Sequence, residues 1–290
     1  MILDQEAAAA LARLQSVLGE LDAPHVAIAV SGGIDSLTLA ASAMPVLGER
    51  LTLHHATSPA VPPEATARTR TLAEERHARL EVFDAGEFED ARYRANPANR
   101  CFFCKSRLYG TIAERLRGTG TLVLSGTNLD DLGDYRPGLQ AAAENDVRHP
   151  FVEAGISKAM LRRIAPLVGL AGLADLPSAP CLSSRIETGL SIEPATLRLV
   201  HAVERLVSDR LAPHTVRARI RREGMVVELD EASLEALDSA RDAELRESVA
   251  AIEASAGELH RPLRFALYRT GSAFLRPDTP ASVVVHEPHS

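Results

Sequence analysis

Residues 25–36 read HVAIAVSGGIDS, an apolar run that ends in a turn rich in serine and glycine. The run at 25–30 is typical of a buried parallel strand, and we expect a helix from Ser36 to about Leu47. The turn at 31–36 then presents consecutive backbone N–H groups, two hydroxyls and the positive end of a helix to one small volume. This stretch predicts a phosphate-binding loop at the end of the first strand.

The residue types of this loop suit a pyrophosphate group. A Cβ at Gly32 or Gly33 would keep the backbone away from the phosphate oxygens or block the turn. Asp35 is unusual beside an anion, so we expect a Mg²⁺ ion to bridge its carboxylate to phosphate, which makes Asp35 a candidate catalytic residue. A plain strand-to-helix turn, capped by Asp35 or Ser36, is the alternative. The predicted nucleotide ligands are Ser31, Gly32, Gly33, Asp35 and Ser36.

Strands and helices alternate along the first half of the chain. Further strands are predicted at 51–54, 80–83 and 122–125, and helices at 5–20, 65–76, 106–116 and 158–168. This alternation predicts an α/β fold with a doubly wound, Rossmann-like parallel sheet. Ligands bind such sheets outside the carboxyl ends of the strands, where the loop at 31–36 would lie.

The pattern changes towards the C-terminus. A proline-rich loop at 176–180 and a helix at 194–211 come before predicted strands at 214–220, 225–229 and 263–268. Two more helices separate the last two strands, which predicts a smaller α+β domain. We expect a nucleotide domain at residues 1–190 and a substrate-binding or oligomerisation domain at residues 191–290.

The three cysteines of the chain lie in two short motifs. Cys101 and Cys104 belong to CFFC, and Cys181 belongs to PCLSSR. A structural zinc site normally uses four protein ligands, whereas three cysteines can hold a cubane iron–sulfur cluster and leave one iron open. We therefore predict Cys101, Cys104 and Cys181 as metal ligands. A zinc site completed by His77 or His149 is the alternative.

Cys181 is also a candidate catalytic residue. Arg185 follows it closely in sequence, and a nearby guanidinium favours the thiolate form that attacks acyl groups. This favours Cys181 as a nucleophile or sulfur carrier over a role as core filler.

Three aspartates follow the predicted strand at 122–125. Asp130, Asp131 and Asp134 come where the topology of a parallel sheet would put them beside the nucleotide. They could hold Mg²⁺ or the ribose, and Asp130 is the one we predict as a nucleotide ligand. Solvated acids in a turn are the alternative.

Several arginines are candidate ligands for anionic groups. Arg217 and Arg219 alternate along a predicted strand and so point to one face, where they could hold a substrate phosphate or carboxylate. We count both as catalytic candidates. Arg221 would share that face, Arg269 is a further candidate, and Arg185 is predicted to contact the nucleotide.

The formal net charge of −7 argues against a long nonspecific grip on nucleic acid, because such binding depends on Lys and Arg. The first residues have neither a basic start nor an uninterrupted apolar stretch, so no signal peptide or membrane anchor is predicted. We expect a cytoplasmic protein.

Several motifs together carry a family resemblance. SGGIDS at 31–36 resembles the PP-loop of the ATP pyrophosphatases, which cleave ATP to AMP and pyrophosphate. With GTNLDDLGDYRPG at 126–138 and PCLSSRIETG at 180–189, the chain resembles the LarE family of that superfamily. VRARIRREG at 216–224 and YRTGS at 268–272 extend the resemblance over nearly the whole chain.

The resemblance implies an activity. ATP adenylates a carboxylate of pyridinium-3,5-biscarboxylic acid mononucleotide, AMP leaves, and a sulfur species forms the thiocarboxylate used in the nickel-pincer nucleotide cofactor. In one form of the family, the cysteine at the position of Cys181 gives up its own sulfur and ends as dehydroalanine. In the other form, three cysteines hold a [4Fe-4S] cluster whose open iron binds sulfide, and the set of Cys101, Cys104 and Cys181 matches that form.

The resemblance also implies partners: the pyridinium mononucleotide, a sulfide source or cysteine desulfurase, and further copies of the chain in a homo-oligomer. Three other functions are open to a chain with this loop. They are a tRNA thiolation enzyme, an amide-forming ligase and a non-catalytic nucleotide-binding protein. The charge of −7 counts against the first, and the set of three cysteines would be unexplained in the second.

Overall fold

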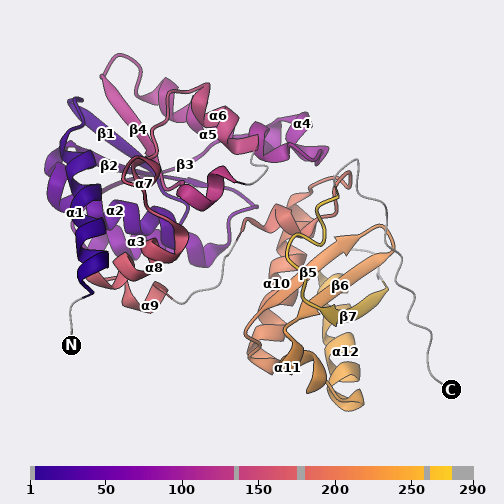
Figure 1. Ribbon diagram of the computed structural model, residues 1–290. Helices are drawn as coiled ribbons and strands as arrows, with labels where there is room; N and C mark the ends of the chain where they lie inside the picture. Colours follow the sequence, from indigo (N-terminus) through magenta and orange to yellow (C-terminus); the bar gives the residue numbers. More distant parts are fainter. Residues whose placement is uncertain (1–3, 134–136, 175–179, 258–261, 276–290) are drawn as a thin grey trace.

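The computed structural model describes residues 4–133, 137–174, 180–257 and 262–275 (Figure 1). Apart from Pro180, the predicted loop at 176–180 lies outside the described residues, as does Asp134. The described chain forms a four-stranded and a three-stranded sheet, each with its own helices.

The first sheet has the strand order β3-β2-β1-β4, and all of its strand pairs are parallel. Its strands are β1 (His25–Ala29), β2 (Leu51–Thr57), β3 (Arg79–Asp84) and β4 (Thr121–Ser125). The central strand β1 is buried at every position after His25, as expected for a parallel strand that is covered on both faces. The predicted α/β fold with a parallel sheet is confirmed.

Helices cover both faces of this sheet. Val26 and Ile28 of β1 face a large core made with α1 (Gln5–Gly19), α2 (Ile34–Leu47), α3 (Pro63–Glu75), α7 (Pro150–Glu153) and α8 (Lys158–Ile164). Ala27 and Ala29 face the opposite core, made with α5 (Arg100–Arg115) and α6 (Pro137–Ala143). Successive side chains of a strand alternate between faces, so β1 supplies both cores. Short helical segments complete this part: η1 (Gly48–Arg50), η2 (Glu87–Glu89), α4 (Ala91–Arg94), η3 (Leu129–Leu132), η4 (Ala165–Val168) and α9 (Ala171–Ala174).

Helix α5 begins at Arg100 rather than at the predicted residue 106. The chain already turns before it, since the Arg100 N–H donates to the carbonyl of Pro97 at 2.9 Å. Cys101 and Cys104 therefore lie in the first turns of a helix, three positions apart and on the same face.

The second sheet has the order β5-β6-β7, with one antiparallel and one parallel pair. Its elements are β5 (Val216–Arg221), β6 (Gly224–Leu229) and β7 (Leu263–Leu267), with α10 (Pro194–Leu211), α11 (Glu231–Glu235) and α12 (Ser239–Ser255). The predicted smaller α+β part is confirmed. Its core also takes in Tyr93 of α4 and Leu182 of η5 (Leu182–Arg185). The domain boundary near residue 190 stays a prediction.

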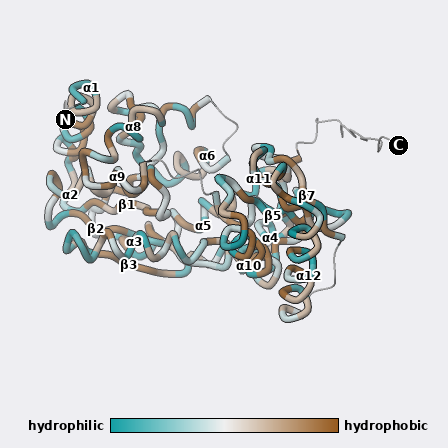
Figure 2. Tube along the Cα trace, turned by 90° about the horizontal axis from the view of Figure 1, so that it is seen from below, coloured by the Kyte–Doolittle hydropathy of each residue, from teal (hydrophilic) through white to brown (hydrophobic). Residues whose placement is uncertain are grey.

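Polar and apolar residues are interleaved along the helices, as Figure 2 shows. Among the described residues, no helix has both the length and the apolar character needed to cross a bilayer.

Candidate active site

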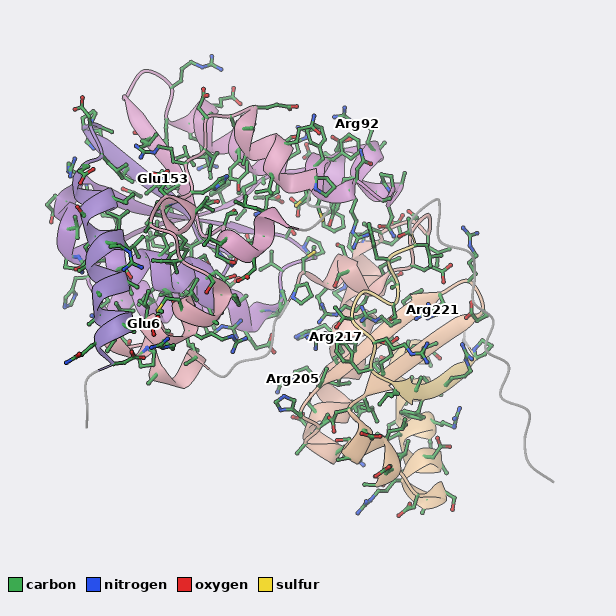
Figure 3. The ribbon with its side chains drawn as sticks, in the orientation of Figure 1. Glu6, Arg92, Glu153, Arg205, Arg217 and Arg221 are labelled. Carbon is green, nitrogen blue, oxygen red and sulfur yellow. The ribbon has the colours of Figure 1, made fainter. Side chains whose placement is uncertain are left out.

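A pocket of about 850 Å³ brings together residues from both sheets and their helices. Residues 31–35 of the predicted phosphate loop line it, together with all three cysteines. From the C-terminal part come residues of α10 and the start of β5, including Arg205 and Arg217. Figure 3 shows these two arginines on the side of α10 and β5 that faces the four-stranded sheet.

A hydroxyl group of the loop at 31–36 fixes the conformation of the loop's own backbone. The Ser31 N–H donates to Ser36 Oγ at 3.0 Å, and this hydroxyl donates to the Gly33 carbonyl at 3.1 Å. Gly33 is the N-cap of α2, so neither Asp35 nor Ser36 caps this helix, and phosphate binding by the loop stays a prediction. Gly32 has φ +76°, and a Cβ there would lie 2.2 Å from the Ala65 carbonyl oxygen. The loop therefore requires glycine at this position.

Asp35 lies beside a residue that the sequence analysis missed. The Lys158 ammonium donates to the Asp35 carboxylate, and the Lys158 backbone N–H donates to Asp130. Asp130 and Asp131 both line the pocket, and Asp131 also accepts from the Asn128 N–H at 3.0 Å and caps η3. The contact of Asp130 with a nucleotide stays a prediction. The amino-acid composition could have pointed to Lys158. The chain has only two lysines, Lys105 and Lys158, and both line this pocket.

Helix α3 supports the loop from the other side. Arg68 Nε donates to the Gly32 carbonyl at 2.9 Å, and burial lowers the pKa of Arg68. One turn earlier, Glu64 accepts from His201 Nε2 of α10 at 3.1 Å. Helix α3 therefore contacts both the phosphate loop and the C-terminal part, and the sequence motifs did not point to these residues.

The cysteines face the same pocket from two elements. Cys101 and Cys104 come from the start of α5, and Cys181 is the N-cap of η5. Cys101 and Cys181 are exposed, and Cys104 is half-buried. Burial raises the pKa of the Cys104 thiol; Lys105 lowers it, and charge on Cys181 raises it further. The thiols are therefore within electrostatic range of one another and of Lys105.

The cysteines are not arranged as ligands of a single ion. Across the described ranges, no group of three or more His, Cys, Asp or Glu side chains is placed to hold one metal ion. Among the described residues, the histidines that line the pocket are His54 and His201. His149 instead pairs its Nδ1 with Ser125 Oγ at 2.8 Å, and His77 is exposed at the end of α3. The zinc alternative completed by His77 or His149 gains no support from this geometry.

The Cys181 loop is anchored by buried polar contacts. The Arg185 guanidinium donates to Glu204 at 2.9 and 3.1 Å, and to the carbonyls of Pro180 and Cys181 at 2.6 and 3.2 Å. Tyr93 and Ser183 share a hydrogen bond of 2.6 Å beneath the same loop. Arg185 lines the pocket, and its contacts make it a support for Cys181. Its contact with a nucleotide stays a prediction.

The arginines of β5 lie in different surroundings. Arg217 lines the pocket, and burial lowers its pKa. Arg219 makes a buried ion pair with Glu228 at 3.0 Å and donates to the Ser184 carbonyl, and Arg221 pairs with the same glutamate at 3.3 Å. Arg217 is therefore the member of this set that faces the pocket, while Glu228 neutralises much of the charge of the other two. Arg269 is exposed, and its carbonyl accepts from Arg219.

Several known proteins are similar in sequence to this chain. No family model matches the chain. An uncharacterized protein of Synechocystis is 40% identical over 210 residues, which cover 72% of this chain and 77% of that protein. The pyridinium-3,5-bisthiocarboxylic acid mononucleotide synthase of Lactiplantibacillus plantarum is 30% identical over 215 residues, 73% of this chain and 77% of the synthase. An uncharacterized protein of Methanocaldococcus jannaschii is 27% identical over 137 residues, 47% of this chain and 53% of that protein. The identity and coverage shared with the synthase show that this chain belongs to the LarE family.

Proposed function

We propose that this chain is an ATP-dependent sulfur transferase. It adenylates a carboxylate of pyridinium-3,5-biscarboxylic acid mononucleotide and converts that group to a thiocarboxylate, an activity in keeping with the name of its Lactiplantibacillus relative. The observation that carries the proposal is that the SGGIDS loop and all three thiols line one pocket. An activated acyl group formed at the loop would lie within reach of sulfur.

The loop would bind the leaving group of the first step. A substrate carboxylate oxygen attacks the α-phosphorus of ATP, a P–O bond forms, and pyrophosphate leaves with the electrons of the bond that breaks. The backbone N–H groups of the loop and the N-terminus of α2 stabilise the charge on this pyrophosphate. When ATP binds, Lys158 moves its charge from Asp35 to a phosphate, which leaves the Asp35 carboxylate for Mg²⁺.

Arg217 would hold the second substrate. The pyridinium mononucleotide carries a phosphate and carboxylates, and the buried guanidinium of Arg217 lines the same pocket as the loop. Attraction between opposite charges strengthens where water is excluded, so this residue suits the anchoring of an anion. The arrangement favours a ternary complex in which the carboxylate meets ATP between the two parts of the chain.

The donor set fits a [4Fe-4S] cluster better than a zinc ion. Cys101 and Cys104 share a helix face, Cys181 lines the same pocket, and the charge effects on Cys104 link all three. A tetrahedral zinc site needs its sulfur ligands about 3.8 Å apart, whereas a cubane accepts sulfur ligands that are further apart. When bound, the cluster supplies an open iron that takes up sulfide.

Cys181 itself is the alternative source of sulfur. Its exposed thiolate attacks the acyl adenylate, AMP leaves and a thioester forms. Removal of the Cα proton of Cys181 then breaks the Cβ–Sγ bond, which releases the thiocarboxylate and leaves dehydroalanine. Arg185 holds the carbonyl of Cys181 in place in either route.

The test separates adenylation from sulfur transfer. Wild type, Cys101→Ala and Cys181→Ala are purified without oxygen, and iron, acid-labile sulfide, pyrophosphate release and thiocarboxylate are measured with Mg-ATP and the mononucleotide. We expect about four irons per wild-type chain, lost in Cys101→Ala, and pyrophosphate release in all three proteins. Thiocarboxylate should be absent with Cys181→Ala.

Two outcomes would redirect the proposal. Wild type that stays iron-free after reconstitution, turns over only once and loses one H₂S equivalent of mass would assign the sulfur to Cys181. Pyrophosphate release that does not depend on the mononucleotide, but does depend on unmodified tRNA, would overturn the substrate and favour a tRNA thiolation enzyme.

A further inference from the structure

Lys105 of α5 lines the pocket and has no charged partner there. Its ammonium lies 5.6 Å from the centre of the Tyr109 ring, and it makes no hydrogen bond or ion pair with any residue that the structure describes. The other lysine of the pocket, Lys158, pairs with Asp35. A cation over an aromatic ring is only weakly stabilised, so a half-buried ammonium without a carboxylate beside it favours an anionic ligand.

A ligand can reach this ammonium from the pocket. Lys105 is half-buried, and its ammonium is not one of the sealed polar atoms that lack a partner, in contrast to the ring nitrogens of His54. Helices α5 and α6 lie side by side (Figure 1), and a Cβ on Gly138 of α6 would come within 3.1 Å of Lys105 Cγ. The contact with α6 therefore packs the apolar stem of Lys105 and leaves its charged end to the pocket.

The three thiols of the pocket are close to this charge. Cys101, Cys104 and Lys105 come from the first turns of α5, and Cys181 lines the same pocket. Charge on Tyr109 and on all three thiols raises the pKa of Lys105, so each of these groups is within electrostatic range of the ammonium. An anion bound to Lys105 would therefore lie beside the sulfur atoms of the site.

We propose that Lys105 binds the hydrosulfide ion that supplies the transferred sulfur. This inference rests on the proposed sulfur transfer, in the form that uses external sulfide. Hydrosulfide carries its charge on one atom, and an ammonium is a compact charge that attracts such an ion from any direction. The guanidinium of Arg217 instead has the forked shape that matches a carboxylate or a phosphate. The two cations thus bind different ligands, with the sulfur anion at Lys105 and the mononucleotide at Arg217.

The sulfide dependence of the reaction tests this role. Thiocarboxylate formation is measured on anaerobically reconstituted wild type, Lys105→Met and Lys105→Arg over a range of sodium sulfide concentrations, with saturating Mg-ATP and mononucleotide. We expect the KM for sulfide to rise about 10-fold or more in Lys105→Met, since a charge-assisted contact is lost, and to recover partly in Lys105→Arg. The KM for ATP should stay as in wild type. Arg107→Met removes an exposed cation of the same helix, which pairs with Asp90, and is the matched control.

A second measurement needs neither turnover nor a bound cluster. The full-length reduced protein is freed of metal and alkylated with iodoacetate, which is an anion, or with iodoacetamide, which is neutral. Cys101 is exposed, and the ratio of its two alkylation rates reports the charge nearby because differences in thiol reactivity cancel. We expect this ratio to be higher in wild type than in a short cysteine peptide, and to fall about 3-fold or more in Lys105→Met. Added salt should reduce the difference.

The outcomes separate this inference from the proposed function. A wild-type alkylation ratio equal to that of the peptide would overturn the inference, as would a KM for sulfide that is unchanged in Lys105→Met. A thiocarboxylate yield that does not depend on added sulfide would also overturn it, and would leave a sulfur transferase that uses Cys181. Wild type that releases no pyrophosphate with Mg-ATP and the mononucleotide would overturn the proposed function, and this inference with it.

Discussion

Lys158 reaches the phosphate loop although 123 positions separate it from Asp35 in the sequence. The loop itself could be predicted, because a strand, two glycines and a helix start are neighbours in the chain. The partner of Asp35 could not, because it depends on how α8 folds back onto the first face of the sheet. Arg219 is a similar case. The alternation of side chains along a strand correctly predicted that Arg219 lies on the same face of β5 as Arg217. Glu228 comes close enough to neutralise Arg219 only because β5 pairs with β6.

At the residue scale, we predict that Lys158→Met weakens Mg-ATP binding by at least about 10-fold, since a charge-assisted contact to phosphate is lost. Lys158→Arg should recover part of the affinity because the charge remains. Titration calorimetry with Mg-ATP measures both variants. Arg241→Met, on the exposed side of α12, is the control for a lost surface charge. Wild-type affinity in Lys158→Met would remove this lysine from the site.

At the scale of elements, the long helices and the strands could be predicted from periodicity, within a few residues at their ends. Helix α4 was missed because four residues carry too little pattern, and the early start of α5 was missed because the adjacent aromatic residues of its first turn, RCFF, show no helical periodicity. Both misses bear on the site. Tyr93 of α4 bonds Ser183 beneath the Cys181 loop, and the first turns of α5 hold the other two cysteines.

Asp90 is the N-cap of α4, so a substitution at Asp90 tests how strongly this cap stabilises the helix that supports the Cys181 loop. Its side chain accepts from the Arg92 N–H at 2.9 Å, and its hydrogen bonds with the Arg92 side chain lower the pKa of Asp90 from 3.8 to about 2. A carboxyl whose pKa falls on folding stabilises the folded state above its unfolded pKa, and this contribution is lost as the pH falls through the folded value. We therefore predict that Asp90→Asn has a lower melting temperature than wild type at pH 7.

The difference between Asp90→Asn and wild type should shrink between about pH 4 and about pH 2. Thermal unfolding followed by circular dichroism across this range measures it. The effect should be modest, because Arg92 is largely exposed and its charge is screened by water. Asp22→Asn, an exposed acid ahead of β1, is the matched control. A difference that stays constant down to pH 2 would show that the charge of Asp90 does not support α4.

At the scale of the whole molecule, the two fold types could be predicted because each sheet is built from segments that are close in sequence. The pocket between them could not be predicted in detail, since it depends on contacts between distant helices. The clearest such contact joins α3 to α10. Glu64 accepts from His201 and lies 3.5 Å from Arg205, while one turn later Arg68 holds the Gly32 carbonyl. A shift of α10 relative to α3 would therefore displace the phosphate loop as well.

This coupling predicts a non-additive pair of substitutions. Glu64→Gln and His201→Leu should each weaken Mg-ATP binding slightly, and the double variant should bind no more weakly than the worse single variant, because both changes remove the same contact. The side chains are partly exposed, so the coupling energy should be only about 0.5 kcal/mol, and it should fall as salt is added. Titration calorimetry on the four proteins at low and high salt measures it.

Asp242→Asn, which breaks an ion pair within α12, is the control that should leave ATP affinity unchanged. Strictly additive effects would mean that α3 supports the loop without any link to the C-terminal sheet, and ATP binding would then be independent of how the substrate-binding part is held.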